Sequence, residues 1–325
     1  MIGVIGATGH LGNNLARELV KKGYEVTAII PEGENLEPLK GIKLDIKYAD
    51  IRNYNSIYKA IEGCDKVFHI AGIVSISQSE WNKLYEVNVL GTRNVVNACI
   101  ERGVQRLVYT SSIHALREPP KGNIITEKLS FQPQYGDYAK SKALATNEVF
   151  EGIKKGLDAV IICPTGVIGP YDYKISEIGT LLLMFARRKI VFYIDGEYDF
   201  VDARDVAYGH ILAMKKGKKG EAYILSGEKI TVRNMLNIIN NEFREKRTLV
   251  RIPVSIAKFA ALFISFARLT SKEKPLFTNY SITVLQSNCD ISSEKARRQL
   301  SFVSRSVKDS LKDSVNWFRE KGYIS

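Results

Sequence analysis

Short apolar segments alternate with amphipathic ones along the first half of this 325-residue chain, and this alternation limits the fold more than any other feature. The apolar segments have the length of buried strands, whereas the segments between them carry apolar residues three and four positions apart, as helices do. Strands joined by helices pair in parallel, and the helices cover both faces of the sheet. We therefore expect an α/β fold with strands at 2–5, 25–30, 43–50, 66–71, 106–111 and 158–164.

The helical pattern predicts four helices between these strands, several of which end at glycine, a common helix stop. They span 10–23, 53–63, 80–103 and 137–156. Right-handed crossovers between the strands then give a doubly wound parallel sheet of the Rossmann type.

The alternation breaks after Pro170. Further helices are expected at 177–189, 202–217 and 306–322, with one more strand at 222–227. We expect residues 1–170 to form the Rossmann domain and 195–227 to return to it. Residues 171–194 and 228–325 are then expected to form a smaller, mostly helical substrate lobe.

A glycine-rich loop, VIGATGHLG, follows the first strand and opens the first helix. Gly6 permits the tight turn, Gly9 lets the backbone approach a pyrophosphate, and Gly12 permits close helix packing. The N-terminus of the helix offers free N–H groups and a partial positive charge to phosphates. Because the loop stands between a strand and a helix, it predicts a dinucleotide site.

The choice between NAD and NADP is less clearly marked. The second strand ends in Ile30 and Pro31, where an acid or an arginine is usual. Glu32, about 20 residues after the loop, could bind the ribose or be a solvated turn residue, so the preference for NAD is slight. After the third strand, Asp50 and Ile51 could face the adenine, and Asp50 could instead cap the next helix.

Composition argues against several other classes of protein. The net charge of +12 is read as a solvated lysine-rich surface, because no zinc-finger spacing, aromatic RNA-binding motif or run of five basic residues accompanies it. We therefore expect no nucleic-acid partner. The four cysteines follow no metal or disulfide spacing, so we expect no metal and a reducing compartment. They are Cys64, Cys99, Cys163 and Cys289.

Membrane insertion is not expected. The chain begins directly with the first strand, which leaves no room for a signal peptide, and no uncharged apolar stretch reaches about 18 residues. The apolar segment 253–269 contains Lys258 and is expected to form a buried or lid-forming helix rather than a membrane anchor. A cytoplasmic protein is the expectation.

Six motifs stand in an order that resembles the extended short-chain dehydrogenase/reductase (NAD-dependent epimerase/dehydratase) family. They are the glycine loop, HIAG (69–72), NVLGT (88–92), YTSS (109–112), YAKSK (138–142) and DARDVA (202–207). The segments PTGVIGPYD (164–172) and YILSGE (223–228) look most like its bacterial dihydroflavonol-reductase-like group. The resemblance covers nearly the whole chain. It implies about seven strands, a smaller C-terminal lobe and NAD or NADP as cofactor.

The resemblance implies a catalytic set of Ser112, Tyr138 and Lys142, with Ser111 as the alternative serine. Tyr138 and Lys142 lie four positions apart and so share a helix face, where an ammonium would lower the pKa of the phenol. Lys140 and Ser141 are interpreted as surface residues. The cofactor is expected against Gly6, Thr8, Gly9, His10, Leu11, Gly12, Glu32, Asp50, Ile51, Ala71, Gly72, Tyr138, Lys142, Pro164 and Val167.

The surroundings of this set are less sharply defined. Asn88 is read as a support for the strand ends or as an ordinary helical amide, and His114 as a structural residue or a substrate contact. Cys163 stands where the family usually has arginine and is not expected to be catalytic. We expect the substrate against Ile73, Val74, Ile113, Tyr171 and Tyr198.

These roles predict an NAD(P)-dependent reductase of a ketone or aldehyde, with a small carbonyl or hydroxyl compound as substrate. A nucleotide-sugar epimerase stays open, because four arginines of the later segments could bind a diphosphate: Arg187, Arg188, Arg204 and Arg233. A non-catalytic NADP-binding regulator would not need both Tyr138 and Lys142. A homodimer also stays open.

Overall fold

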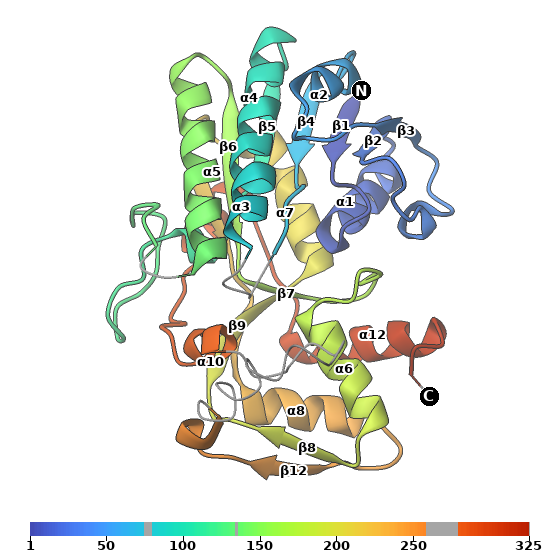
Figure 1. The fold of residues 1–325 in the computed structure, drawn as a ribbon, viewed down its shortest axis with the longest axis vertical. Coiled ribbons are helices and arrows are strands. Elements are labelled where there is room, and N and C mark those ends of the chain that lie inside the picture. Colours follow the sequence, from blue (N-terminus) through green and yellow to red (C-terminus); the bar gives the residue numbers. More distant parts are fainter. Residues whose placement is uncertain (75–79, 134–135, 258–278, 325) are drawn as a thin grey trace.

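The computed structural model describes residues 1–74, 80–133, 136–257 and 279–324 (Figure 1). The helix expected at 253–269 lies outside the described residues from position 258 onward. None of the described helices is long and apolar enough to cross a membrane.

A seven-stranded sheet forms the centre of the upper part of Figure 1, in the order β10-β6-β5-β4-β1-β2-β3. All six neighbouring pairs are parallel. The predicted strands are thus confirmed, with slightly narrower bounds at most of them. They are β1 (Ile2–Ile5), β2 (Val26–Ile30), β3 (Asp45–Tyr48), β4 (Lys66–His69), β5 (Arg106–Thr110), β6 (Ala159–Pro164) and β10 (Ala222–Leu225).

Helices pack on both faces of this sheet and create two hydrophobic cores. One core contains residues of α1 (His10–Lys21) and α7 (Ala203–Lys216). The opposite core contains residues of α2 (Tyr54–Ala60), α4 (Gly91–Glu101) and α5 (Asp137–Lys154). Because the central strands are covered on both sides, they read as continuous apolar runs rather than alternating ones.

The helix predicted at 80–103 is divided into three parts. It begins as α3 (Trp81–Leu84), continues as the π-helical segment η2 (Tyr85–Leu90) and ends as α4. Single π-helical turns within helices are frequent at functional sites. Asn88, from the NVLGT motif, lies within this turn.

The C-terminal part of the chain is mostly helical, as expected, and gathers at the lower end of the molecule in Figure 1. A third hydrophobic core holds this end together. Its helices are α6 (Glu177–Arg187), α8 (Val232–Asn241), α10 (Asn279–Leu285) and α12 (Val307–Glu320).

Two small sheets in this region were not predicted. One consists of β7 (Gly166–Ile168), β9 (Glu197–Asp202) and β11 (Glu228–Thr231), and the other of β8 (Ile190–Tyr193) and β12 (Thr248–Arg251). Short helical turns complete the fold at η1 (Glu37–Leu39) and η3 (Ile113–Ala115). The division of the chain at residue 170 stays a prediction; α11 (Glu294–Leu300), which it assigns to the lobe, packs against α7 and β10.

Candidate active site

The order of the strands reverses between β1 and β4, and in doubly wound sheets ligands bind where the strands end at such a point. The glycine loop leaves β1 here and closely approaches the end of β4. Gly6 has φ +89, and a Cβ at this residue would lie 2.7 Å from the Cα and N atoms of Ala71. Glycine is therefore required at position 6, and Ala71 forms the opposite wall of the loop.

The start of α1 has the geometry of an anion site. Gly9 is the N-cap of the helix and makes no side-chain capping hydrogen bond, so the first-turn N–H groups of His10 and Leu11 are not capped by it. A Cβ at Gly12 would lie 2.1 Å from the carbonyl oxygen of Gly6, so the helix can pack this closely only with glycine. These residues fit the pyrophosphate of a dinucleotide.

The three predicted catalytic residues come from the C-terminal end of β5 and the N-terminal end of α5. Ser112 follows β5, and Tyr138 and Lys142 lie in the first turns of α5. The Lys142 side chain is buried and donates a hydrogen bond of 2.6 Å from Nζ to the carbonyl oxygen of Thr110. A Cβ at Gly72 would lie 3.9 Å from this Nζ, so the loop after β4 reaches the same place.

Burial changes the acid–base properties of this set. It lowers the pKa of Lys142 to about 7. It also raises the pKa of Tyr138, while an interaction with the Ser112 side chain acts in the opposite direction. The lowering of the phenol pKa that we expected from Lys142 is therefore not seen, because desolvation dominates at Tyr138 and Lys142 Nζ is directed to Thr110.

The two candidate serines have different partners. The Ser111 hydroxyl lies 2.7 Å from the Thr146 hydroxyl, inside the contact between β5 and α5. The Ser112 hydroxyl accepts a hydrogen bond of 3.2 Å from the backbone N–H of His114 and interacts with Tyr138. Since its acceptor site is used in this way, the Ser112 hydrogen can be directed to another oxygen. This geometry favours Ser112 over Ser111.

Asn88 connects the loop after β4 with the start of α5. Its Oδ1 accepts from the N–H of Ile73 at 2.9 Å, and its Nδ2 donates to the Ser141 hydroxyl at 2.9 Å. Ser141 in turn donates to the carbonyl oxygen of Tyr138 at 2.8 Å. Ser141, which we interpreted as a surface residue, is thus completely buried; only the spatial neighbour Asn88 reveals its role.

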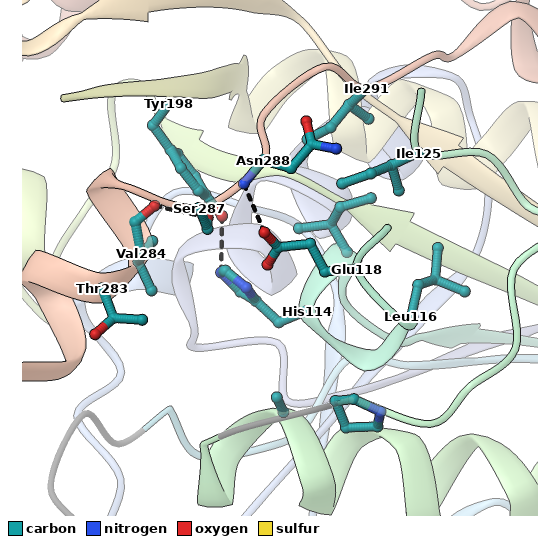
Figure 2. Close-up of a pocket in the computed structure, with 13 residues that line it drawn as sticks. His114, Leu116, Glu118, Ile125, Tyr198, Thr283, Val284, Ser287, Asn288 and Ile291 are labelled. Carbon is teal, nitrogen blue, oxygen red and sulfur yellow. Dashed lines mark hydrogen bonds between the residues drawn. The ribbon is translucent and has the colours of Figure 1, made fainter. Parts of the chain in front are cut away.

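A cavity is lined by the residues that directly follow Ser112 and Tyr138 in the chain, Ile113 and Ala139, and two of the predicted substrate residues, Ile113 and Tyr198, belong to its lining. Figure 2 shows His114 and Tyr198 directed toward one another, with 2.7 Å between Nε2 and the phenol oxygen. Burial lowers the pKa of His114 to about 4, so the imidazole is neutral near pH 7. Further lining residues are Leu116, Glu118, Ile125, Val284, Asn288 and Ile291.

The other predicted substrate residues lie elsewhere. The Tyr171 ring packs 4.5 Å from the guanidinium carbon of Arg17, on α1. Ile73 is held by Asn88, and the Val74 side chain is 68% exposed. The structure therefore does not bring Tyr171, Ile73 and Val74 together with Tyr198 among the described lining residues of the cavity.

The residues expected near the adenine have structural partners. Asp50 makes an ion pair with Arg52, and this hydrogen-bonded guanidinium lowers the pKa of the Asp50 carboxyl. Helix α2 is capped by Asn53, not by Asp50. Ile51 is buried against Gly91. Two other residues expected to bind the cofactor, Pro164 and Val167, lie at the end of β6 and within β7.

The acidic residue beside the glycine loop is Glu34, which the sequence analysis missed. Its carboxylate accepts a hydrogen bond of 3.1 Å from the Thr8 hydroxyl and pairs with Lys174 at 2.8 Å. Glu32, the residue that we expected there, is exposed. Both glutamates have suitable spacing in the sequence, and only the path of the turn after β2 distinguishes them.

The four arginines considered for a diphosphate do not line the described part of the cavity. Arg204 is paired with Asp202 and Asp313. Arg187 and Arg188 lie at the end of α6, and Arg233 lies at the start of α8.

Known proteins resemble this chain over nearly its whole length. Residues 2–226 match the model of the NAD-dependent epimerase/dehydratase family. A protein from Methylococcus capsulatus named sterol demethylase protein B is 35% identical, over 99% of both chains. A protein from Synechocystis sp. provisionally named dihydroflavonol 4-reductase is 30% identical, over 99% of this chain and 95% of its own. The crystal structure of gox2253 has a TM-score of 0.85 at 27% identity and covers 100% of this chain and 99% of that one.

Proposed function

Because the chain belongs to the NAD-dependent epimerase/dehydratase family, we propose that it is an NAD(P)-dependent reductase that transfers a hydride to a ketone or aldehyde. One observation carries this proposal. Ser112, Tyr138 and Lys142 meet beside a glycine loop that fits a dinucleotide, next to a cavity with a largely apolar lining.

Carbonyl reduction requires a hydride at carbon and a proton at oxygen. A bound NAD(P)H supplies the hydride. Tyr138 donates the proton to the substrate oxygen, and Ser112 stabilises the negative charge that develops there by donating a hydrogen bond. Lys142, with a pKa of about 7, can exchange a proton near neutrality one helical turn from Tyr138 on α5. Asn88 and Ser141 hold the backbone of Tyr138 in position.

The lining of the cavity supports a reductase rather than the alternative, a nucleotide-sugar epimerase. The described lining of the cavity has no lysine or arginine side chain to pair with the diphosphate of a nucleotide sugar. It combines apolar side chains with a neutral His114, the Glu118 carboxyl group and a few uncharged polar side chains. The names of the two relatives refer to a sterol and to a dihydroflavonol, which are compounds with large apolar skeletons. We infer a substrate of this general kind, with a carbonyl or hydroxyl group at the reacting carbon.

The decisive experiment measures consumption of NADH and NADPH by the purified protein with a panel of aldehydes and ketones. Tyr138→Phe should lower kcat by about 100-fold or more, because the proton donor is lost. The matched control is Tyr323→Phe at an exposed tyrosine, which should leave kcat unchanged. Conversion of a UDP-sugar without net consumption of cofactor would overturn the reductase and favour the epimerase.

We also propose a reducing compartment such as the cytoplasm, because all four cysteines are unpaired and buried. A homodimer stays a prediction, to be checked by the molar mass in solution.

A further inference from the structure

We propose that the outer face of the small parallel sheet, β8 and β12, docks the protein onto the surface of an anionic membrane. The apolar side chains of this face enter the lipid interface, and a cluster of arginines and lysines beside them meets the negative headgroups. Docking requires neither the cofactor nor turnover, so it is independent of the proposed reductase activity.

The small sheet has one apolar face that is not buried. Along β8, Val191 and Tyr193 belong to the third hydrophobic core. Ile190 and Phe192 alternate with them on the opposite face, and they are 49% and 50% exposed. Val250 of β12 pairs with Phe192 in the register and so extends the same face. We call this the outer face of the sheet.

Such exposure is unusual for parallel strands. Parallel sheets occur almost only where both of their faces are covered. The strands β8 and β12 lie below α8 at the lower end of the molecule (Figure 1), and their inner face packs into the core. Neighbouring large apolar side chains that remain exposed mark an interaction site. We infer that a partner covers the outer face.

Basic residues gather at one end of the same sheet. Because β8 and β12 are parallel, the segments that precede them meet, and the N–H of Thr248 donates to the carbonyl oxygen of Lys189 at 2.9 Å. The segments 187–189 and 242–247 together contain six basic residues and two acidic ones. The basic residues are Arg187, Arg188, Lys189, Arg244, Lys246 and Arg247, and the acidic ones are Glu242 and Glu245.

Four of these cations are available to a partner. They are exposed and make no ion pair with any other residue that the structure describes: Arg187, Arg188, Lys189 and Arg244. Lys246 and Arg247 instead donate to backbone carbonyl oxygens of Phe243 and Phe185. The end of the sheet therefore carries a net positive charge directly beside the apolar outer face.

An anionic lipid surface fits both properties. Large apolar side chains next to lysine and arginine are typical of surfaces that lie in the membrane interface, and each cation adds to the attraction by anionic lipids. A second copy of the chain offers the same face, so it brings four more unpaired cations instead of their counter-charges. A polyanion such as a nucleic acid would use the cations and leave the apolar side chains uncovered.

The outer face is connected to the wall of the cavity described above. Ile252 and Val254, which follow β12, pack with Ile282 of α10 in a fourth hydrophobic cluster. Thr283 and Val284 follow on α10 and line the cavity. Docking would thus bring the cavity close to the phase in which compounds with large apolar skeletons dissolve. This last consequence alone rests on the proposed function.

Sedimentation of the full-length protein with lipid vesicles tests the docking. The protein should sediment with vesicles of phosphatidylcholine and phosphatidylglycerol, and about tenfold less with pure phosphatidylcholine, because the attraction between charges is lost. The double variant Ile190→Thr/Phe192→Thr should weaken partition into the anionic vesicles about tenfold, because it removes apolar contact and keeps β-propensity. The matched control is Val303→Thr, at a residue that is 77% exposed, and it should change nothing.

The charge is tested separately. Arg188→Gln/Lys189→Gln should also weaken partition into the anionic vesicles about tenfold. The matched control is Lys154→Gln/Lys155→Gln, at two exposed lysines where α5 ends, which removes the same net charge and should have little effect. All of these substitutions replace exposed side chains, so the thermal midpoint should stay within about 2 °C of the wild type.

Three results would overturn the proposal. The first is a wild-type protein that does not sediment with anionic vesicles. The second is sedimentation that Ile190→Thr/Phe192→Thr leaves unchanged, since this is adsorption of a basic protein to any polyanion. The third is a thermal midpoint that falls by about 5 °C or more in that variant, which would show that another part of the same chain covers the face. A protein that sediments as expected and reduces no carbonyl compound would contradict only the reductase.

Discussion

Lys142 is buried with its ammonium on a backbone carbonyl, and this placement affects the stability of the protein as well as its chemistry. An unfolded lysine has a pKa of about 10.4, whereas burial lowers the pKa of Lys142 to about 7 in the folded protein. Between these values the unfolded chain binds more protons than the folded one. Stability from this group therefore increases as the pH rises from 7 toward 10.

Lys142→Met should remove that dependence. The free energy of unfolding of the wild type should gain up to about 1.4 kcal/mol per pH unit from this group, and the variant should lack this part of the slope. Urea unfolding at pH 7, 8 and 9 measures the slopes, with Lys140→Met at an exposed neighbour as the control. Equal slopes for wild type and Lys142→Met would contradict the low pKa.

Single residues of the site were predictable only where their role depends on spacing along the chain. Tyr138 and Lys142 share a helix face because they are four positions apart. Glu34 and Ser141 become recognisable only through partners far away in the sequence, Thr8 and Asn88. No local pattern distinguishes Glu34 from Glu32, since both belong to one polar turn.

The start of α1 combines two glycines with different physical demands. A Cβ at Gly12 would lie within 2.1 Å of a backbone oxygen, whereas a Cβ at Gly9 would lie an ordinary 3.4 Å from the same atom. Gly9 also has a negative φ of −70, which any residue can adopt. Gly12 is therefore required for the packing of the helix against the loop. Gly9 is instead required by a ligand, such as a pyrophosphate, that approaches the start of the helix.

We accordingly expect Gly9→Ala to keep its thermal midpoint within about 2 °C of the wild type while its Kd for NADH rises about tenfold or more. Gly12→Ala should instead lower the thermal midpoint by about 5 °C or more, because the turn must move. Differential scanning calorimetry and NADH titration separate the two effects. A Gly9→Ala variant that binds NADH normally would argue against a pyrophosphate at this position.

Long amphipathic helices and the apolar strands of the main sheet were predictable, and the short strands of the two small sheets were not. Helices α1, α5, α7 and α12 follow their apolar spacing to within a few residues. The two-stranded pairing of β8 with β12 has only four residues in each strand and joins distant segments, so local propensity carries little information about it. The π-helical turn around Asn88 is likewise set by tertiary contacts, since its sequence reads as ordinary helix.

The molecule as a whole keeps two histidines completely buried, His69 at the end of β4 and His210 on α7. Desolvation lowers the pKa of His69 to about 3 and that of His210 to about 4. An unfolded histidine binds a proton below a pH of about 6.5, whereas these two remain neutral in the folded state. Stability is therefore lost as the pH falls below about 6.5.

Acid unfolding should show this loss. Together with His114, whose pKa burial also lowers to about 4, these groups contribute up to about 4 kcal/mol per pH unit between pH 6 and pH 4, and His210→Gln should remove about a third of that slope. Urea unfolding at several acidic pH values provides the measurement. If His210→Gln leaves the slope unchanged, the buried imidazole is not the source of the effect.

The pairing of β10 with β6 has a consequence for the way the chain is made. After β6 emerges from the ribosome, residues 165–221 must follow before its neighbour exists. During that interval the nascent sheet ends in a bare strand whose N–H and C=O groups can pair with another chain. β10 thus covers the free edge of β6, and α6 and α7 must be synthesised before this edge can be covered.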